Sequence, residues 1–208
     1  MHIPDGVLSL PVLAGGGIVT ALALVKSLPM VSEAALPKVA VVSALFFVAS
    51  LISVPIGPTS VHLVLSALMG LVLGWAAVPA VFVGLVLQAV FFGFGGLTTL
   101  GVTTAIIALP GVFWSMVLRG TIARSEGATR RGLLAATAAG LSIATSAGLV
   151  IAVLGLSDPH YLASAPFVAA TYLPLLVAEG LITGFAVAFL SRVRPETLAL
   201  AAPEAGNA

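Results

Sequence analysis

The chain has 208 residues, of which 60% are hydrophobic and 7% are charged, and its formal net charge is +1. In soluble domains about a quarter of the residues are charged, so this composition indicates an integral membrane protein. The sequence contains no cysteine, which excludes disulfides and thiolate metal sites. The small, scattered net charge argues against nucleic-acid binding. The expected surroundings are a lipid bilayer.

The hydrophobic segments predict an all-α membrane protein with seven transmembrane helices in one bundle. A transmembrane helix needs about 20 mainly apolar residues, and seven segments approach this length. The predicted spans are Pro11–Leu28, Pro37–Val54, Thr59–Gly74, Val78–Phe92, Gly101–Arg119, Gly132–Leu154 and Ala163–Phe189. The third and fourth are short and joined by little more than Trp75, which predicts a tight helical hairpin.

The basic residues predict the orientation of the bundle. With the N-terminus outside, seven spans place every basic residue on the cytoplasmic side, which an even number of spans cannot do. These residues are Lys26, Lys38, Arg119, Arg124, Arg130, Arg131, Arg192 and Arg194. We therefore expect a cytoplasmic C-terminus, with residues 1–196 as one transmembrane domain. Residues 1–10 would form an outer loop and residues 197–208 a short disordered tail.

The chain begins MHIPDG, which lacks the basic n-region of a signal peptide. In an outside N-terminus, the α-amine of Met1, the amide nitrogen of His2 and the His2 imidazole can bind one metal ion together. Thr59 or Ser60 can cap the third helix, which would place His62 in its first turn as a fourth nitrogen ligand. Planar nitrogen ligands favour Ni(II) or Cu(II), and imidazole also suits Co(II).

Two more features of this region bear on the site. The Pro4–Gly6 turn would fold the N-terminal peptide back over the mouth of the bundle. Within that turn, Asp5 is a candidate for orienting a ligand imidazole.

The same histidines admit other interpretations. A His at position 2 is most often an accident of a terminus, and a His in the first turn of a membrane helix is most often an interfacial hydrogen-bonding residue. His160, in LSDPHYL, is expected in an exposed loop. The alternative for His160 and Asp158 is a role in gathering metal at the outer surface.

Two polar or small-residue features lie within the predicted spans. Glu179 is the one carboxylate there, and intramembrane ionisable residues are usually functional. We expect Glu179 to make an internal hydrogen bond or a subunit contact rather than bind metal, and Gln88 has the same ambiguity. Gly17 and Ala21 form a small-residue face on the first span, which fits packing within the bundle or docking of another membrane subunit.

Several absent motifs narrow the function. The chain has no GxxxxGK[ST] sequence, so we do not expect it to hydrolyse ATP. It has no HExxH motif and no obvious internal repeat of a secondary transporter. These absences favour a non-enzymatic membrane subunit that depends on a separate motor.

Four stretches resemble the CbiM/NikM family: MHIPDG, VPIGPTSVHL, LVLQAVFFGFGGLTTLG and PLLVAEGLITGFAVAFLSRVRPE. This family comprises the substrate-binding S components of energy-coupling factor (ECF) transporters for cobalt and nickel. The resemblance implies seven helices, an extracellular N-terminus, and metal ligands from Met1, His2 and His62. The bound Ni(II) or Co(II) would be cargo rather than a cofactor.

The resemblance also implies partners in a prokaryotic inner membrane. These are a CbiQ/NikQ-type transmembrane coupling subunit, CbiO/NikO-type ATPases and often a small CbiN/NikN-type membrane subunit. Many relatives carry asparagines after GGLTTLG, where this chain has threonines such as Thr103. Asp5, Ser60 and Thr103 are therefore candidates for supporting the N-terminal loop or the metal. The alternatives are an S component for another micronutrient, or a structural membrane subunit whose histidines are incidental.

Overall fold

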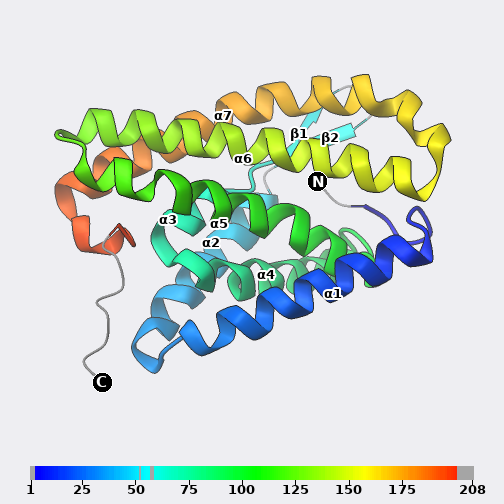
Figure 1. Ribbon diagram of the computed structural model, residues 1–208, viewed down its shortest axis with the longest axis horizontal. Helices are drawn as coiled ribbons and strands as arrows, with labels where there is room; N and C mark the ends of the chain where they lie inside the picture. Colours follow the sequence, from blue (N-terminus) through cyan, green and yellow to red (C-terminus); the bar gives the residue numbers. More distant parts are fainter. Residues whose placement is uncertain (1–2, 52, 57–58, 201–208) are drawn as a thin grey trace.

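The computed structural model describes residues 3–51, 53–56 and 59–200 (Figure 1). Within these residues the chain forms seven α-helices and one two-stranded antiparallel hairpin. The helices are α1 (Leu10–Ser27), α2 (Leu36–Leu51), α3 (Ser66–Leu73), α4 (Ala77–Phe92), α5 (Leu100–Arg124), α6 (Ala128–Ser157) and α7 (Ala165–Val193). The strands are β1 (Ser53–Ile56) and β2 (Thr59–His62). The predicted helical fold is confirmed, except for the hairpin.

Six segments of the described chain are long and apolar enough to cross a membrane, rather than the seven predicted. They are Leu10–Met30, Glu33–Leu51, Ser66–Phe92, Leu100–Arg124, Ala128–Ser157 and Pro159–Val193. The eight residues of α3 extend only about 12 Å, too short for a hydrocarbon core of about 30 Å. Together with α4 it forms one candidate span, interrupted at Gly74, where φ is +60°. The chain is a multi-pass membrane protein.

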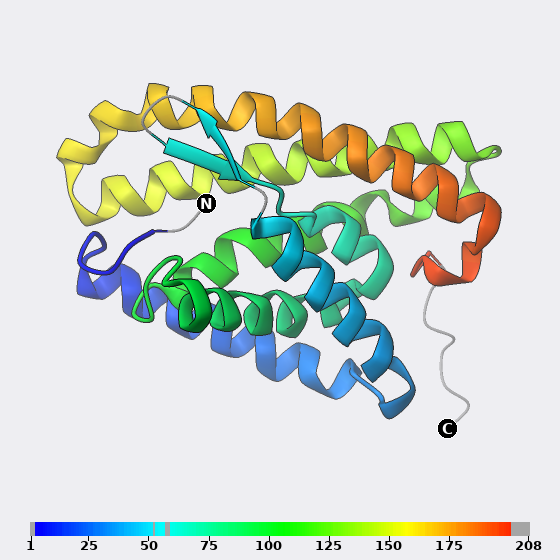
Figure 2. The same ribbon diagram turned by 180° about the vertical axis from the view of Figure 1, so that it is seen from behind.

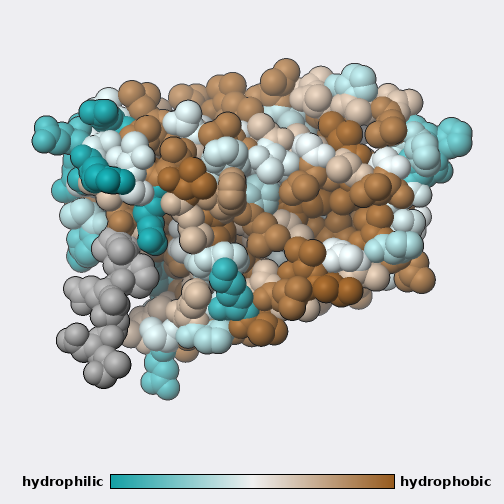
Figure 3. Space-filling model, in the orientation of Figure 1, coloured by the Kyte–Doolittle hydropathy of each residue, from teal (hydrophilic) through white to brown (hydrophobic). Residues whose placement is uncertain are grey.

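The surface of the molecule matches this assignment. Figure 3 shows an apolar band over the middle of the bundle, with hydrophilic residues gathered towards its two ends. Large side chains such as Leu22, Leu181 and Phe185 are exposed on the outer faces of their helices. Inside the bundle, Phe46 and Ile107 are fully buried. This distribution places the exposed apolar surface where lipid would surround it.

The long helices α6 and α7 run side by side, and α1 lies against α5 (Figures 1 and 2). The α1–α2 turn, the α5–α6 turn and the end of α7 lie towards one end of the bundle in Figure 1. These are the segments that carry the basic residues. The fold therefore brings those residues together at one end.

The described part of the predicted tail packs against the bundle. Lys38 Nζ donates to the Thr197 carbonyl at 2.7 Å, and the Ala199 amide donates to the Leu71 carbonyl at 2.7 Å. Leu198 is buried between these contacts. Residues 201–208 lie outside the described residues, so disorder of the tail stays a prediction there.

The small residues of α1 pack within the bundle. A Cβ on Gly101 of α5 would lie 2.8 Å from the Gly17 Cα atom, so the two backbones are in close contact. Thr20 Oγ1 also donates to the Gly101 carbonyl at 2.6 Å. Ala21 is exposed. Gly17 therefore serves the α1–α5 contact, and docking of another subunit at Ala21 stays a prediction.

We predict that Gly101→Ala lowers the melting temperature of the purified protein in detergent. The added methyl would meet the Gly17 backbone, which cannot rotate away, and such overpacking costs about 1–3 kcal/mol. Gly15→Ala is the matched control, because nothing lies within 4 Å of its Cβ position. Replacing a helical glycine there should leave stability unchanged or raise it by up to about 1 kcal/mol. An unchanged melting temperature for Gly101→Ala would contradict the close α1–α5 packing.

Candidate metal centre

His62 lies at the end of strand β2, not in the first turn of a helix as predicted. Its backbone is paired with Ser53 in the β1–β2 ladder, and α3 begins only at Ser66. Helix capping by Thr59 or Ser60 is therefore wrong, because both residues lie in the same strand. Strand β2 includes the β-branched residues Thr59 and Val61, which suit extended backbone.

The second predicted span also ends earlier than expected, for a related reason. Helix α2 stops at Leu51, and Val54 lies in β1 opposite Val61. Pro55, in the middle of β1, is a poor residue for continuing a helix. The sequence between α2 and α3 thus forms a hairpin where continuous helices were predicted.

The His62 side chain is buried, with 5% of its surface exposed. Its Nδ1 atom lies 3.1 Å from the carbonyl oxygen of Leu63. A proton on Nδ1 would donate to that oxygen and leave Nε2 with the lone pair that binds a metal. Burial also lowers the pKa of His62 to about 4. The imidazole is therefore held neutral, which is the form that coordinates metals.

Glu179 fixes the connection that follows His62. Two backbone amides of this connection donate to the Glu179 carboxylate. The Val64 amide donates to Oε1, and the Leu65 nitrogen lies 2.8 Å from Oε1 and 3.0 Å from Oε2. Glu179 is 1% exposed. Its side chain is an internal hydrogen-bond acceptor, and this placement does not favour the predicted alternative of a subunit contact.

The N-terminal segment is fastened to the loop between α4 and α5. Thr99 Oγ1 donates to the Ile3 carbonyl at 2.7 Å. The Asp5 carboxylate accepts from the Thr98 hydroxyl, and from the Thr98 amide at 3.0 Å. These bonds to Thr98 hold the pKa of Asp5 below its usual value, so Asp5 stays ionised at neutral pH. Met1 and His2 themselves lie outside the described residues.

Two features make this attachment close. A Cβ on Gly96 would lie 1.9 Å from Asp5 Oδ1, so only glycine fits at that position of the loop. Ile3 and Leu8 are buried in a small apolar cluster with Val102 and Ile106 of α5. The segment therefore folds back over the end of the bundle, as Figure 2 shows in dark blue.

Two buried polar side chains, on α4 and α5, have no hydrogen-bond partner among the described residues. Thr103 lies one helical turn after Thr99 on α5, and its Oγ1 has no hydrogen-bond partner within the described part of the chain. Gln88, near the end of α4, is fully buried, and both of its amide atoms also lack partners there. Such groups retain hydrogen-bonding capacity for water or a ligand. Ser60 is paired through its backbone with Pro55, and its side chain is outside the description.

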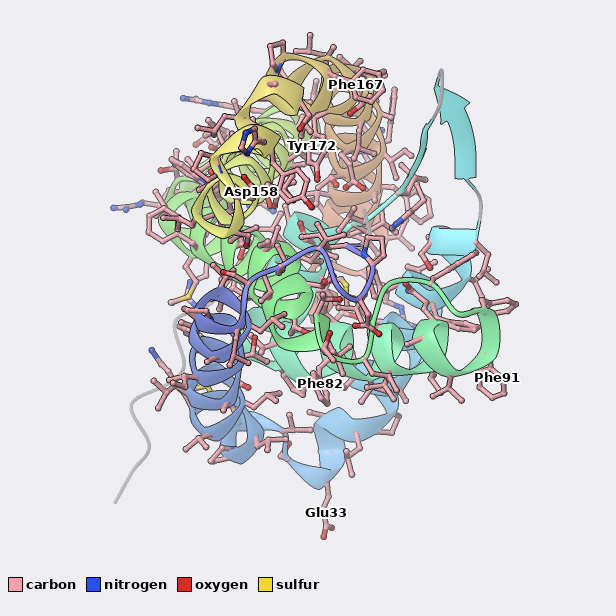
Figure 4. The ribbon with its side chains drawn as sticks, turned by 90° about the vertical axis from the view of Figure 1, so that its right-hand side faces the viewer. Glu33, Phe82, Phe91, Asp158, Phe167 and Tyr172 are labelled. Carbon is pink, nitrogen blue, oxygen red and sulfur yellow. The ribbon has the colours of Figure 1, made fainter. Side chains whose placement is uncertain are left out.

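Figure 4 views the bundle from the end that carries the N-terminal segment. Tyr172 points from α7 towards the interior, whereas Glu33 and Phe91 point outwards. Asp158 lies at the same end and pairs with exposed His160, Nδ1 to Oδ1, at 2.8 Å. Asp158 also accepts from the His160 amide, which lowers the pKa of Asp158. Asp158 caps the short 3-10 helix Pro159–Ser164.

Clustering of side chains does not reveal a complete metal site. No group of three or more His, Asp or Glu side chains that could hold a metal occurs within residues 3–51, 53–56 and 59–200. His62 is the buried imidazole in this part of the chain, since His160 lies at the surface. Sequence reasoning identified His62 and Glu179 as notable, but missed that Glu179 holds the connection after His62. The sequence feature that indicated Glu179 was a single carboxylate within an apolar predicted span.

Comparison with known proteins places these features in a family. The chain matches the model described as CbiM, cobalt uptake substrate-specific transmembrane region, over residues 2–197. A Haemophilus influenzae chain named as a metal transport protein is 32% identical over 95% of this chain and 97% of its own length. A fused nickel transport protein NikMN of Rhodobacter capsulatus is 34% identical over 96% of this chain and 64% of its own length.

A solved structure gives the same result. The crystal structure of a transition metal transporter superposes with a TM-score of 0.81 and 26% identity, over 93% of each chain. The resemblance noted from MHIPDG and the three other stretches is thus confirmed. The chain belongs to the CbiM/NikM family, and is a membrane component of cobalt or nickel transport.

Proposed function

We propose that this chain is the substrate-binding S component of an ATP-driven ECF importer in a prokaryotic inner membrane. The cargo is Co(II) or Ni(II), bound by the Met1 amine, the amide and imidazole nitrogens of His2, and the imidazole of His62. The proposed orientation places the N-terminus outside and the C-terminus in the cytoplasm. Although α3 and α4 count as one of six candidate spans in the described chain, the start of α1 and the end of α7 lie at opposite ends of the bundle in Figure 1, which supports an odd number of crossings. Basic residues gathered at the opposite end of the bundle support this orientation.

The observation that carries the proposal is the anchoring of Ile3 and Asp5 to residues 98 and 99. Two residues precede Ile3, and an extended chain of two residues reaches at most about 7 Å from Ile3. The anchored segment and the β1–β2 hairpin lie in the same half of the bundle in Figures 1 and 2. The hairpin ends at a buried, neutral imidazole, His62. Nitrogen ligands from both sources can therefore converge on one ion.

The fold suits a subunit that binds cargo and leaves energy conversion to others. The proposed partners are a CbiQ/NikQ-type coupling subunit, CbiO/NikO-type ATPases and a CbiN/NikN-type membrane subunit. The fused NikMN protein of Rhodobacter capsulatus supports the last of these by its name. The unpartnered hydroxyl of Thr103 and amide of Gln88 would then be available to hydrogen-bond the ligand peptide or its water.

Metal content tests the proposal. Protein with its native N-terminus is exposed to equal Ni(II) and Co(II), desalted and analysed beside His2→Ala and His62→Ala. We expect stoichiometric metal in the native protein and less than one metal per chain in both variants after desalting, because each variant lacks one imidazole ligand and binds the ion more weakly. His160→Ala is the matched control and should retain the metal, since His160 lies at the surface with Asp158. Metal that survives both substitutions would contradict the proposed ligands.

A second control isolates the α-amine. A long extension before Met1 converts the amine to a peptide bond, which should abolish binding. The same extension after Ala208 should have no effect. Equal binding by the two extended proteins would show that the N-terminal nitrogen is not a ligand.

The pH dependence of His62 gives an independent test. In a His2→Ala, His160→Ala protein, the remaining imidazole signal followed by NMR should stay neutral from pH 8 to pH 5 and titrate near 4. An unfolded chain takes up this proton near 6.5, so stability should decrease as pH falls from 6.5 towards 4. Metal lost above pH 5 is then due to protonation at the N-terminus. A midpoint near 6.5 would contradict the burial of His62.

A further inference from the structure

The carboxylate of Glu179 holds the backbone between His62 and helix α3 from the side of α7. It accepts from the amides of Val64 and Leu65, two and three residues after His62. Among the described residues, the ion pairs do not include Glu179, so backbone amides rather than a cation satisfy it. A buried carboxylate is retained only where such donors compensate its loss of water.

The backbone at this point adopts a conformation that needs support. Leu65 has φ +54° and is the non-glycine residue with positive φ within the described chain. L-residues other than glycine rarely adopt this left-handed region without local stabilisation. Both oxygens of Glu179 lie within hydrogen-bond distance of the Leu65 amide. The carboxylate of Glu179 therefore supports the turn that contains this left-handed residue.

Helix α5 packs against the next residue of the connection. A Cβ on Gly111 would lie 2.5 Å from the carbonyl carbon and oxygen of Ser66, so α5 and the start of α3 are in close contact. Ser66 Oγ is also 3.0 Å from Ser142 Oγ of α6. The connection is thus held by α7 before Ser66 and by α5 and α6 at Ser66. Of these three contacts, the one from Glu179 lies nearest to His62 along the chain.

We propose that Glu179 is a positioning residue for metal binding, which sets the place of the His62 imidazole through the Val64 and Leu65 amides. This inference rests on the proposed function, because it assumes that His62 is a ligand. Without the carboxylate, two buried amides would lack an acceptor, and the turn would rearrange to satisfy them. His62 would move with the turn, although neither its own side chain nor the N-terminal segment is altered.

The test is a double-mutant cycle on Ni(II) affinity, measured by competition with a chelator, together with the visible absorption spectrum. Glu179→Gln removes the negative charge and one acceptor oxygen, and leaves a single neutral oxygen for the amides of Val64 and Leu65. We expect affinity to fall about 10- to 100-fold, as for other residues that orient metal ligands. The spectrum should match that of His62→Ala, since the same nitrogen is lost. In the His62→Ala background, Glu179→Gln should cause no further loss.

Thr183→Val is the matched control. Thr183 lies one turn after Glu179 on α7, is fully buried, and its hydroxyl has no hydrogen-bond partner among the residues described. Its replacement perturbs the same part of the helix without touching the connection to His62, so Ni(II) affinity should be unchanged. An equal loss in Thr183→Val and Glu179→Gln would mean that the effect is general destabilisation of α7, and would overturn the inference.

Other outcomes separate the two proposals. If the native protein binds no Ni(II), or His62→Ala binds it normally, the proposed function fails and the inference fails with it. If His62→Ala weakens binding but Glu179→Gln does not, or if the two losses multiply, the inference alone is wrong. Should Glu179→Gln not fold, Glu179→Asp keeps the charge and shortens its reach. Unchanged affinity in folded Glu179→Asp would equally overturn the inference.

Discussion

The central constraint on this structure is that a stretch of extended backbone interrupts the helical membrane bundle between α2 and α3. Peptide groups away from water must be hydrogen-bonded, and non-helical backbone at membrane depth persists only where protein surrounds it. The β1–β2 ladder provides hydrogen bonds for part of the backbone between α2 and α3. Beyond His62, the carboxylate of Glu179 accepts from the amides of Val64 and Leu65. A single ionisable side chain in α7 therefore makes the non-helical segment compatible with the bundle.

This constraint explains why the two halves of the proposed site are supported differently. His62 depends on distant helices, because its strand end is secured by α7 and by the packing of Ser66 on Gly111. The N-terminal segment depends on one neighbouring loop, through Thr98, Thr99 and Gly96. The first support is buried in the bundle, whereas the Asp5–Thr98 contact is exposed to solvent.

Much of the fold could be predicted from the sequence. The long apolar runs predicted the helices, and the positions of Lys and Arg predicted that the basic residues gather at one end of the bundle. The hairpin was missed because the prolines of VPIGPTSVHL were interpreted only as helix ends, and because its extended form depends on pairing between its own two halves. His62 was identified as a ligand candidate, yet its setting was missed for the same reason. The sequence could not decide between the two roles expected for Glu179, because its partners are backbone amides. Every residue except proline has such an amide, so residue types do not indicate which ones Glu179 contacts. Conversely, Gly17 was found by spacing, and only the contact with Gly101 showed which helix it packs against.

The most direct test of the account is X-ray absorption at the metal edge of the Ni(II)-loaded protein with its native N-terminus. The account predicts a shell of nitrogen donors at a planar ion, with imidazole scattering from two histidines that decreases to one in His62→Ala. Such a result would place the N-terminal nitrogens and His62 on the same ion. A shell dominated by oxygen, or an imidazole contribution unaltered by His62→Ala, would contradict it.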